Sequence, residues 1–152
     1  MTANIKTVKG IFSLSFDEKR GLSQLRFPNS SSSSSSEKIP PNAKQIQKIL
    51  DRYFLGKKIS QFPQLTMALG TPFQQRVWQT LQKIPYGETR SYAWVAQQIG
   101  NPKAARAVGS ACGKNPIPIF IPCHRVVATS GALGGFSCGL AWKKFLLKLE
   151  QN

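Results

Sequence analysis

The run Ile121-Pro122-Cys123-His124-Arg125-Val126-Val127 places a thiol directly beside an imidazole, and His124 is the only histidine of the 152-residue chain. An apolar segment precedes the run. This setting is typical of a buried loop or short strand that carries one reactive side chain into a pocket. A thiol attacks as the thiolate, and a neighbouring base or cation promotes its formation. Cys123 is therefore a candidate nucleophile and His124 a candidate base, although a small buried cysteine beside a structural histidine is the alternative reading.

The chain is strongly basic, with 21 Lys and Arg against 6 Asp and Glu and a net charge of +15. Such an excess favours a polyanionic partner, through phosphate contacts and counterion release. Residues 1–68 carry 11 basic and 4 acidic side chains, and residues 69–152 carry 10 and 2. Because both halves share the excess, the charge alone does not locate a binding face.

Length and composition limit the class of protein. A chain of this length forms one good core, or one core with a small appendage. It has no apolar run near 18 residues and no apolar N-terminal signal region, so we expect neither a membrane span nor secretion. Three cysteines without disulfide-like spacing indicate a reducing compartment, hence a cytoplasmic protein. One histidine and no close cysteine pair predict no metal site.

A reduced α+β domain is predicted over residues 1–65. Residues 5–27 alternate around 17–21 as in a hairpin whose turn Gly21 supplies. Seven consecutive serines predict a flexible segment over 29–37. Asn42 is expected to cap a helix that runs through Leu55 and ends at Gly56, and residues 61–69 read as an extended link. The expected buried side chains are Ile11, Leu14, Phe16, Leu22, Leu25, Phe27, Ile46, Ile49, Leu50 and Tyr53.

The second predicted domain, residues 70–152, opens with Thr71 as an N-cap and Pro72 as the first helical residue. An apolar stripe follows and ends at Pro85. The last predicted helix spans 140–151 and is amphipathic. The stripe comprises Phe73, Val77, Trp78, Leu81 and Ile84; in the last helix Phe145, Leu146 and Leu149 are expected inward and Lys143, Lys144 and Lys148 outward.

Two short helices are predicted between these elements. Ser91 caps the first, residues 100–101 form the turn, and Pro102 is expected to start the second, which runs to about Gly113. This pattern fits a helix-turn-helix as well as an ordinary pair of antiparallel helices. On the second helix Ala105, Val108 and Cys112 form a core face, and Lys103, Arg106, Ser110 and Lys114 form a small basic face.

The basic face has little bulk around its arginine. Ala107, Gly109 and Ser110 surround Arg106, whereas major-groove readers carry several long polar side chains. Small residues allow backbone to approach a narrow groove closely while one long cation reaches in. The pattern therefore favours close approach of this helix to a narrow groove, with a phosphate-contacting or solvent-exposed Arg106 as the alternative.

The segments Arg106-Ala107-Val108-Gly109, Asn115-Pro116 and Pro122-Cys123-His124-Arg125-Val126 resemble, in order and spacing, the O6-alkylguanine-DNA alkyltransferases. The resemblance is close from Thr71 to Glu150 and weak over the first 65 residues. It implies an α+β fold, in which a small β-hairpin and helix precede a mostly helical, winged-helix-like domain with a helix-turn-helix.

The resemblance also implies a function. A monomer without cofactor binds double-stranded DNA through the minor groove, flips the damaged base, and transfers its alkyl group irreversibly to Cys123. O6-alkylguanine is the expected substrate, and O4-alkylthymine a poorer one. Such a protein would work at the nucleoid of a prokaryote or in the nucleus of a eukaryote.

Residue roles follow by matching positions. His124 takes the thiol proton, and the resemblance selects Glu150 rather than Glu88 to orient it. Tyr92 assists the departure of guanine, and Asn115 braces the site. Arg106 fills the space left by the extruded nucleotide. The other expected DNA contacts are Lys103, Ala107, Gly109, Ser110, Lys114 and Arg125, and the expected pocket residues are Pro118, Val126, Phe136 and Ser137.

One position departs from the family. Phe136, in the glycine- and serine-rich loop 129–139, stands where family members commonly have tyrosine, so packing on the base survives and a hydroxyl contact does not. Three other functions remain as alternatives. An alkyltransferase-like lesion-binding protein would lack the cysteine that is present here, a Cys-His hydrolase would need an oxyanion site, and a transcription regulator would leave the Pro122–Val126 run unexplained.

Overall fold

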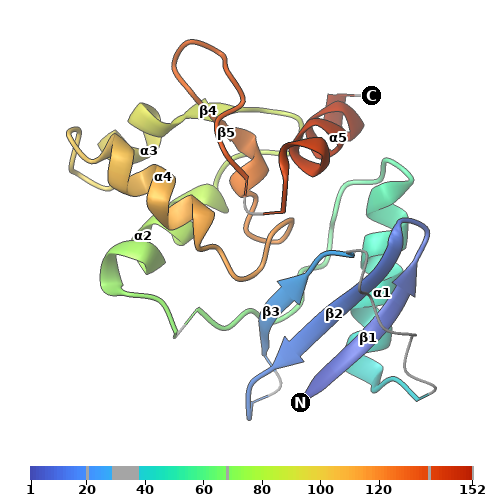
Figure 1. Ribbon diagram of the computed structural model, residues 1–152. Helices are drawn as coiled ribbons and strands as arrows, with labels where there is room; N and C mark the ends of the chain where they lie inside the picture. The colour runs from blue at the N-terminus through green and yellow to red at the C-terminus, as the bar shows by residue number, and fades with distance from the viewer. Residues whose placement is uncertain (20, 29–37, 68, 137, 152) are drawn as a thin grey trace. The chain divides into compact units, whose positions relative to one another are not determined.

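The computed structural model describes residues 1–19, 21–28, 38–67, 69–136 and 138–151 (Figure 1). The fold is mixed α/β, with a small antiparallel sheet and five α-helices within these residues. It divides into two compact units, Met1–Met67 and Ala68–Asn152. The predicted flexible segment 29–37 lies outside the described residues. Within the described part of the chain, no helix combines the length and the apolar character that crossing a membrane requires.

The sheet of the first unit has three strands, in the order β1 (Thr2–Thr7), β2 (Gly10–Phe16) and β3 (Leu22–Arg26). The predicted hairpin corresponds to β2 and β3, whereas β1 extends the sheet on the other side of β2. The turn is closed by Asp17, whose carboxylate accepts a hydrogen bond from the Gly21 amide at 2.7 Å. Gly21 is not in the left-handed region; a Cβ there would collide with the Thr66 hydroxyl, so close approach explains the glycine.

The link after α1 belongs to this sheet as well. Leu22 donates a backbone hydrogen bond to Gln64 at 2.7 Å and accepts one from Thr66 at 2.8 Å. Part of the segment expected to be an extended link is therefore paired along β3. This pairing ties the link to the sheet just before the first unit ends at Met67.

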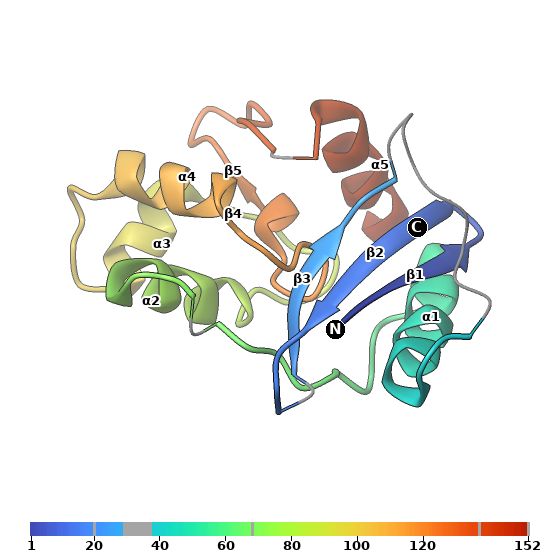
Figure 2. The ribbon, with the colours of Figure 1, turned by 60° about the horizontal axis from the view of Figure 1, so that its bottom comes forward.

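Helix α1 (Pro41–Phe54) lies beside β1 against one face of the sheet (Figures 1 and 2). Asn42 is not its cap, because the N-cap position is Pro40 and Pro41 begins the helix. Gly56, with φ of 91°, ends the helix as predicted. The alternation of β2 buries Phe12, Leu14 and Phe16, so the expectation of a buried Ile11 was wrong by one residue. Phe27 and Ile49, also expected to be buried, are half-buried.

The second unit opens with α2 (Pro72–Leu81). Thr71 and Gln74 form the reciprocal bonds of a capping box, and Pro72 occupies the first turn. The indole of Trp78 donates to the Ala111 carbonyl at 2.9 Å, which joins α2 to the core face of α4. The predicted start of this helix is confirmed.

Helices α3 (Tyr92–Gln98) and α4 (Ala105–Gly113) follow. The Ser91 hydroxyl caps α3 by accepting from the Trp94 amide at 3.0 Å, as predicted. Gly100 makes the turn with φ of 79°. The expected helix start at Pro102 was wrong: residues 101–104 form a further turn, so Lys103 precedes the helix.

Helix α5 (Leu140–Gln151) has the predicted bounds, and Leu146 is buried as expected. The expectation that Lys143 points outward was wrong, because Lys143 is fully buried. Its ammonium donates to the carbonyls of Val126 and Gly135. Hydropathy does not reveal such acceptors. Among described residues, 128–139 carry neither helix nor strand, as predicted for the loop.

Candidate active site

Cys123 and His124 begin a single 3-10 turn, η1 (Cys123–Arg125), and their exposed fractions are 3% and 0%. The loop before them bends sharply at Ile119, whose φ is 77°. Asn115 spans this loop: its amide nitrogen donates to the Ile121 carbonyl at 2.7 Å, and its oxygen accepts from the Ile117 amide at 2.9 Å. These bonds hold the chain that leads from α4 to the thiol.

A two-strand pairing brings Tyr92 to the same site. Strand β4 (Arg90–Ser91) pairs in parallel with β5 (Val126–Val127), with Arg90 opposite Val126 and Ser91 opposite Val127. The residue after β4 begins α3, and the residues before β5 form η1. Tyr92 and Cys123 are therefore neighbours although they are far apart in sequence.

Glu150 is the carboxylate at the imidazole. His124 Nε2 lies 2.7 Å from Glu150 Oε2, and both side chains are buried. The other carboxylate considered, Glu88, instead pairs at the surface with Arg90 at 2.9 Å. His124 Nδ1 is buried and has no hydrogen-bond partner within the part of the chain that the structure describes. The imidazole is thus held at one nitrogen and keeps the other available.

Arg125 occupies an unexpected position. Its Nε and Nη2 donate to the two oxygens of Glu150 at 2.8 and 3.0 Å, and its Nη1 donates to the Ile84 carbonyl at 2.8 Å. The guanidinium also lies 5.8 Å from the centre of the Tyr86 ring. We expected Arg125 to contact DNA; its guanidinium is instead bound inside the site. Nothing in the sequence indicated that a carboxylate would accept two hydrogen bonds from this guanidinium.

Burial dominates the protonation of the reacting pair. It raises the pKa of the Cys123 thiol to about 12, against the opposing effects of the Asn115 hydrogen bond and the Lys143 charge. Burial also lowers the pKa of His124, although the hydrogen bond and charge of Glu150 act the other way. At rest the site therefore holds a neutral thiol beside a neutral imidazole.

Lys143 is the site residue that the sequence did not reveal. Its ammonium lies 2.8 Å from the Val126 carbonyl, 3.2 Å from the Gly135 carbonyl and 5.9 Å from the centre of the Tyr92 ring. Burial lowers the pKa of Lys143, and the negative charge that Cys123 or Cys112 would carry as a thiolate opposes this. The charge of Lys143 therefore acts on the Cys123 thiol and can stabilise negative charge that develops there.

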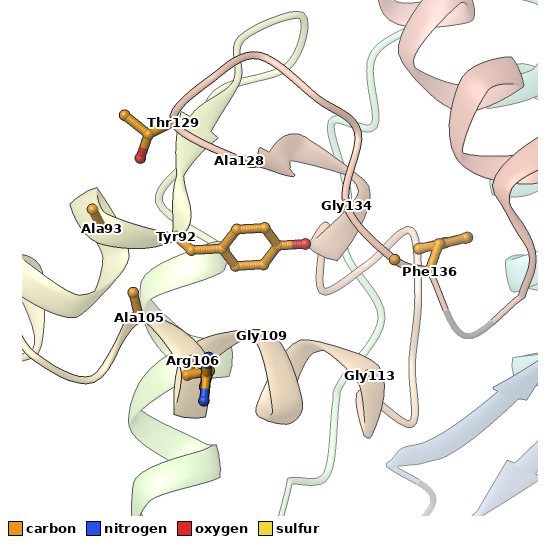
Figure 3. A pocket seen from close by; sticks show the side chains of 11 residues that line it. Tyr92, Ala93, Ala105, Arg106, Gly109, Gly113, Ala128, Thr129, Gly134 and Phe136 are labelled. Carbon is orange, nitrogen blue, oxygen red and sulfur yellow. The ribbon is translucent and has the colours of Figure 1, made fainter.

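A cavity of about 700 Å³ opens beside the site. Its size is that of a small-molecule pocket. Figure 3 shows the Tyr92 ring reaching from the start of α3 towards the loop at Gly134. Burial raises the pKa of Tyr92, and the negative charge of a Cys112 or Cys123 thiolate would raise it further, so the phenol keeps its proton. The lining residues are Tyr92, Ala93, Ala105, Arg106, Gly109, Gly113, Ala128, Thr129, Gly134, Gly135 and Phe136.

The structure separates the residues expected to form the pocket. Phe136 lines the cavity, whereas Pro118 and Val126 are buried and do not line it. Val126 is in β5, and Pro118 is bridged to Ile121 in the loop before the thiol. Both therefore belong to the backbone segments that flank Cys123 and not to the cavity wall. Ser137 lies outside the described residues.

The expected DNA contacts gather around α4. Arg106 lines the cavity and is exposed, as are Ala107, Ser110 and Lys114. Gly109 is half-buried where α4 passes Tyr92, and a Cβ there would meet the ring at 3.7 Å. Lys103 is exposed in the turn before α4.

Comparison with known proteins agrees with this geometry. Residues 72–152 match the family model of the DNA-binding domain of 6-O-methylguanine DNA methyltransferase. A methylated-DNA–protein-cysteine methyltransferase of Methanosarcina acetivorans is 50% identical over 70% of this chain and 68% of its own length. A relative of that name from Mycobacterium leprae is 54% identical over 68% of this chain and 62% of its own length.

A solved structure extends the likeness to the whole fold. The crystal structure of Mycobacterium tuberculosis OGT in complex with DNA superposes with a TM-score of 0.83 at 42% identity. The superposition covers 99% of this chain and 92% of that one. The chain therefore belongs to the 6-O-methylguanine DNA methyltransferase family.

Proposed function

We propose that this protein repairs DNA by direct reversal, transferring an alkyl group from O6 of guanine, and less readily from O4 of thymine, to Cys123. The observation that carries the proposal is the buried Cys123-His124-Glu150 cluster beside a cavity that Tyr92 and Arg106 line. The relatives' names describe methyl transfer from DNA to a protein cysteine. A thioether offers no easy leaving route, so each molecule acts once.

Proton transfer precedes or accompanies attack, because Cys123 is a thiol at rest. His124 Nδ1 accepts this proton, directly or through a water. Nε2 meanwhile keeps its own proton, which it donates in a hydrogen bond to Glu150. The sulfur then attacks the alkyl carbon, the bond from carbon to O6 breaks, and its electron pair leaves with guanine. Tyr92 donates a hydrogen bond or its proton to that anion.

Recognition of DNA falls to the second unit, which we assign as a winged-helix-like domain with α3 and α4 as its helix-turn-helix. Small residues on α4 allow close approach to the minor groove, and Arg106 enters the stack where the damaged base leaves. The exposed cations Lys103 and Lys114 contact phosphates. The cavity receives the flipped base, and Phe136 packs against it. No cofactor takes part.

A lesion-binding protein without chemistry is the second candidate, and the presence of Cys123 next to an oriented base disfavours it. Stoichiometry tests the proposal. With excess duplex DNA that carries O6-methylguanine, repair should stop at one lesion per protein molecule, with or without chelator. Repair that continues past one equivalent would indicate a turnover enzyme, and no repair would indicate a binding protein.

A further inference from the structure

The carboxylate of Glu150 is surrounded by donors. Oε1 accepts from Arg125 Nε at 2.8 Å and from the Gly87 amide at 3.2 Å. Oε2 accepts from Arg125 Nη2 at 3.0 Å and faces His124 Nε2 at 2.7 Å. The Glu150 side chain is only 1% exposed, so water does not replace these bonds. Arg125 is held in turn by the Ile84 carbonyl and the Tyr86 ring.

This arrangement strongly disfavours a proton on the carboxylate. A guanidinium keeps its protons throughout the accessible pH range and a backbone amide only donates, so both oxygens already act as acceptors. Glu150 is therefore ionised, and the proton between it and His124 belongs to Nε2. That tautomer leaves the lone pair of the imidazole on Nδ1, the nitrogen without a partner among the described residues.

We propose that Arg125 is a positioning residue for alkyl transfer: it keeps Glu150 an ionised acceptor, and thereby fixes His124 in the tautomer whose Nδ1 can take the proton of Cys123. This inference deepens the function proposed above and rests on it. Arg125 acts through Glu150 and touches neither substrate nor DNA.

Removing the guanidinium changes the proton affinity of the pair in a definite direction. A buried carboxylate that loses its cation binds a proton more readily. The Arg125 charge also lowers the pKa of His124, so its loss acts in the same direction. Within the part of the chain that the structure describes, the other titratable groups that act on the pair are Lys143 from α5, on His124, and Tyr86 from the segment after α2, on Glu150. Without Arg125 the pair holds an extra proton near neutral pH, and Nδ1 cannot act as the base.

The single histidine makes this state directly measurable. Long-range ¹H–¹⁵N spectra of unreacted protein, labelled at histidine and purified without a histidine tag, contain one imidazole. The wild type should show a neutral ring protonated at Nε2 near neutral pH. Arg125→Met should show a proton on Nδ1, as an imidazolium or as the other tautomer. An Nε2-protonated neutral ring in a folded Arg125→Met protein would overturn the proposal.

Two further variants separate positioning from folding. Arg125→Lys keeps the charge and should keep the wild-type tautomer. The double variant Arg125→Met/Glu150→Gln removes both charges; its amide oxygen still accepts from Nε2, so the ring should return to the neutral, Nε2-protonated form. If Arg125→Met alone does not fold, these two variants decide the question, and a double variant that retains the extra proton contradicts the mechanism.

Reaction with free O6-benzylguanine supplies a kinetic test without DNA. Arg125→Met should be slower near neutral pH by about 10- to 100-fold, which is at most the lower end of the effect of a positioned general base. Its rate should recover as pH rises, with a midpoint about 1–3 pH units above that of the wild type. Arg90→Met, which removes the exposed pair with Glu88, is the matched control and should keep the wild-type midpoint.

The outcomes also distinguish this inference from the proposed function. An unchanged midpoint with normal free-base rate, but weaker binding to duplex DNA, would make Arg125 a DNA contact and overturn the inference. The predicted histidine spectra in a protein that transfers no alkyl group would instead support the positioning by Arg125 and refute the transfer reaction.

Discussion

The ammonium of Lys143 lies 2.8 Å from the carbonyl oxygen of Val126. Lys143 belongs to α5, whose other cations, Lys144 and Lys148, face solvent. The same group donates to Gly135 at 3.2 Å. One side chain of α5 thus fixes β5, which follows the reactive turn, and the loop that lines the cavity. A buried lysine with two carbonyl acceptors joins the nucleophile to the wall of its pocket.

Lys143→Met should therefore destabilise the protein. The substitution keeps the apolar stem but removes the ammonium donor from two carbonyls, which costs about 1–3 kcal/mol. The melting temperature should fall by several degrees for a chain of this size. Lys144→Met, which changes the exposed neighbour, is the matched control and should melt like the wild type. Equal midpoints for both variants would show that the two bonds contribute nothing.

The pH dependence of Cys123 labelling tests the resting state. Since burial raises the pKa of the thiol to about 12, its thiolate fraction at neutral pH is far below that of an ordinary cysteine. Labelling of Cys123 by iodoacetamide, followed by peptide mass, should be very slow and should rise through pH 10 without a plateau. Cys138, which is half-buried, is the internal comparison. A plateau below about pH 8 would indicate a preformed thiolate.

Arg106→Ala should impair duplex DNA repair far more than reaction with free O6-benzylguanine. The guanidinium is exposed on α4, where it can fill a vacated base stack but does not support the thiol. Comparing the two rate constants isolates this role. Lys103→Ala is the control for charge; it should mainly reduce the salt dependence of binding, by roughly one unit of slope per lost phosphate contact. Equal losses on both substrates would show that Arg106 supports the pocket and does not act mainly through DNA.

Alkylation of Cys123 should destabilise the protein. The thiol is 3% exposed, and its neighbours Ile121, His124 and Val126 are fully buried. Adding carbon to a packed site typically costs about 1–3 kcal/mol. Thermal melts of methylated and unmodified protein, matched in buffer and free of DNA, should differ by several degrees. An unchanged or raised midpoint would mean that the site has room for the alkyl group.

Local signals predicted helix starts well where a side chain bonds the first turn. Thr71 and Ser91 cap their helices as expected, because a hydroxyl satisfies an amide three residues later. Asn42 and Pro102 misled because each has the composition of a helix start without that geometry. In the first case Pro40 is the N-cap residue and Pro41 begins the helix, and in the second a turn precedes Ala105.

The residues of the candidate site also differ in whether the sequence alone could predict their roles. The motif around Cys123 and His124 is contiguous, so the sequence predicted both residues, and resemblance selected Glu150. Partners that depend on tertiary packing were not predictable from it. Arg125 turns to Glu150, and Lys143 turns inward to carbonyls contributed by distant segments. The sequence pattern identifies these side chains as cations, and only the fold shows which oxygens they bind.

Intact mass tests the central claim most directly. The protein is mixed with equimolar duplex DNA that carries a single O6-methylguanine, and its mass is measured and mapped by peptides. The account predicts one added methyl group, on the peptide that contains Cys123, and none in Cys123→Ala. An unmodified protein bound to the lesion, or a methyl group on Cys112 or Cys138 instead, would contradict it.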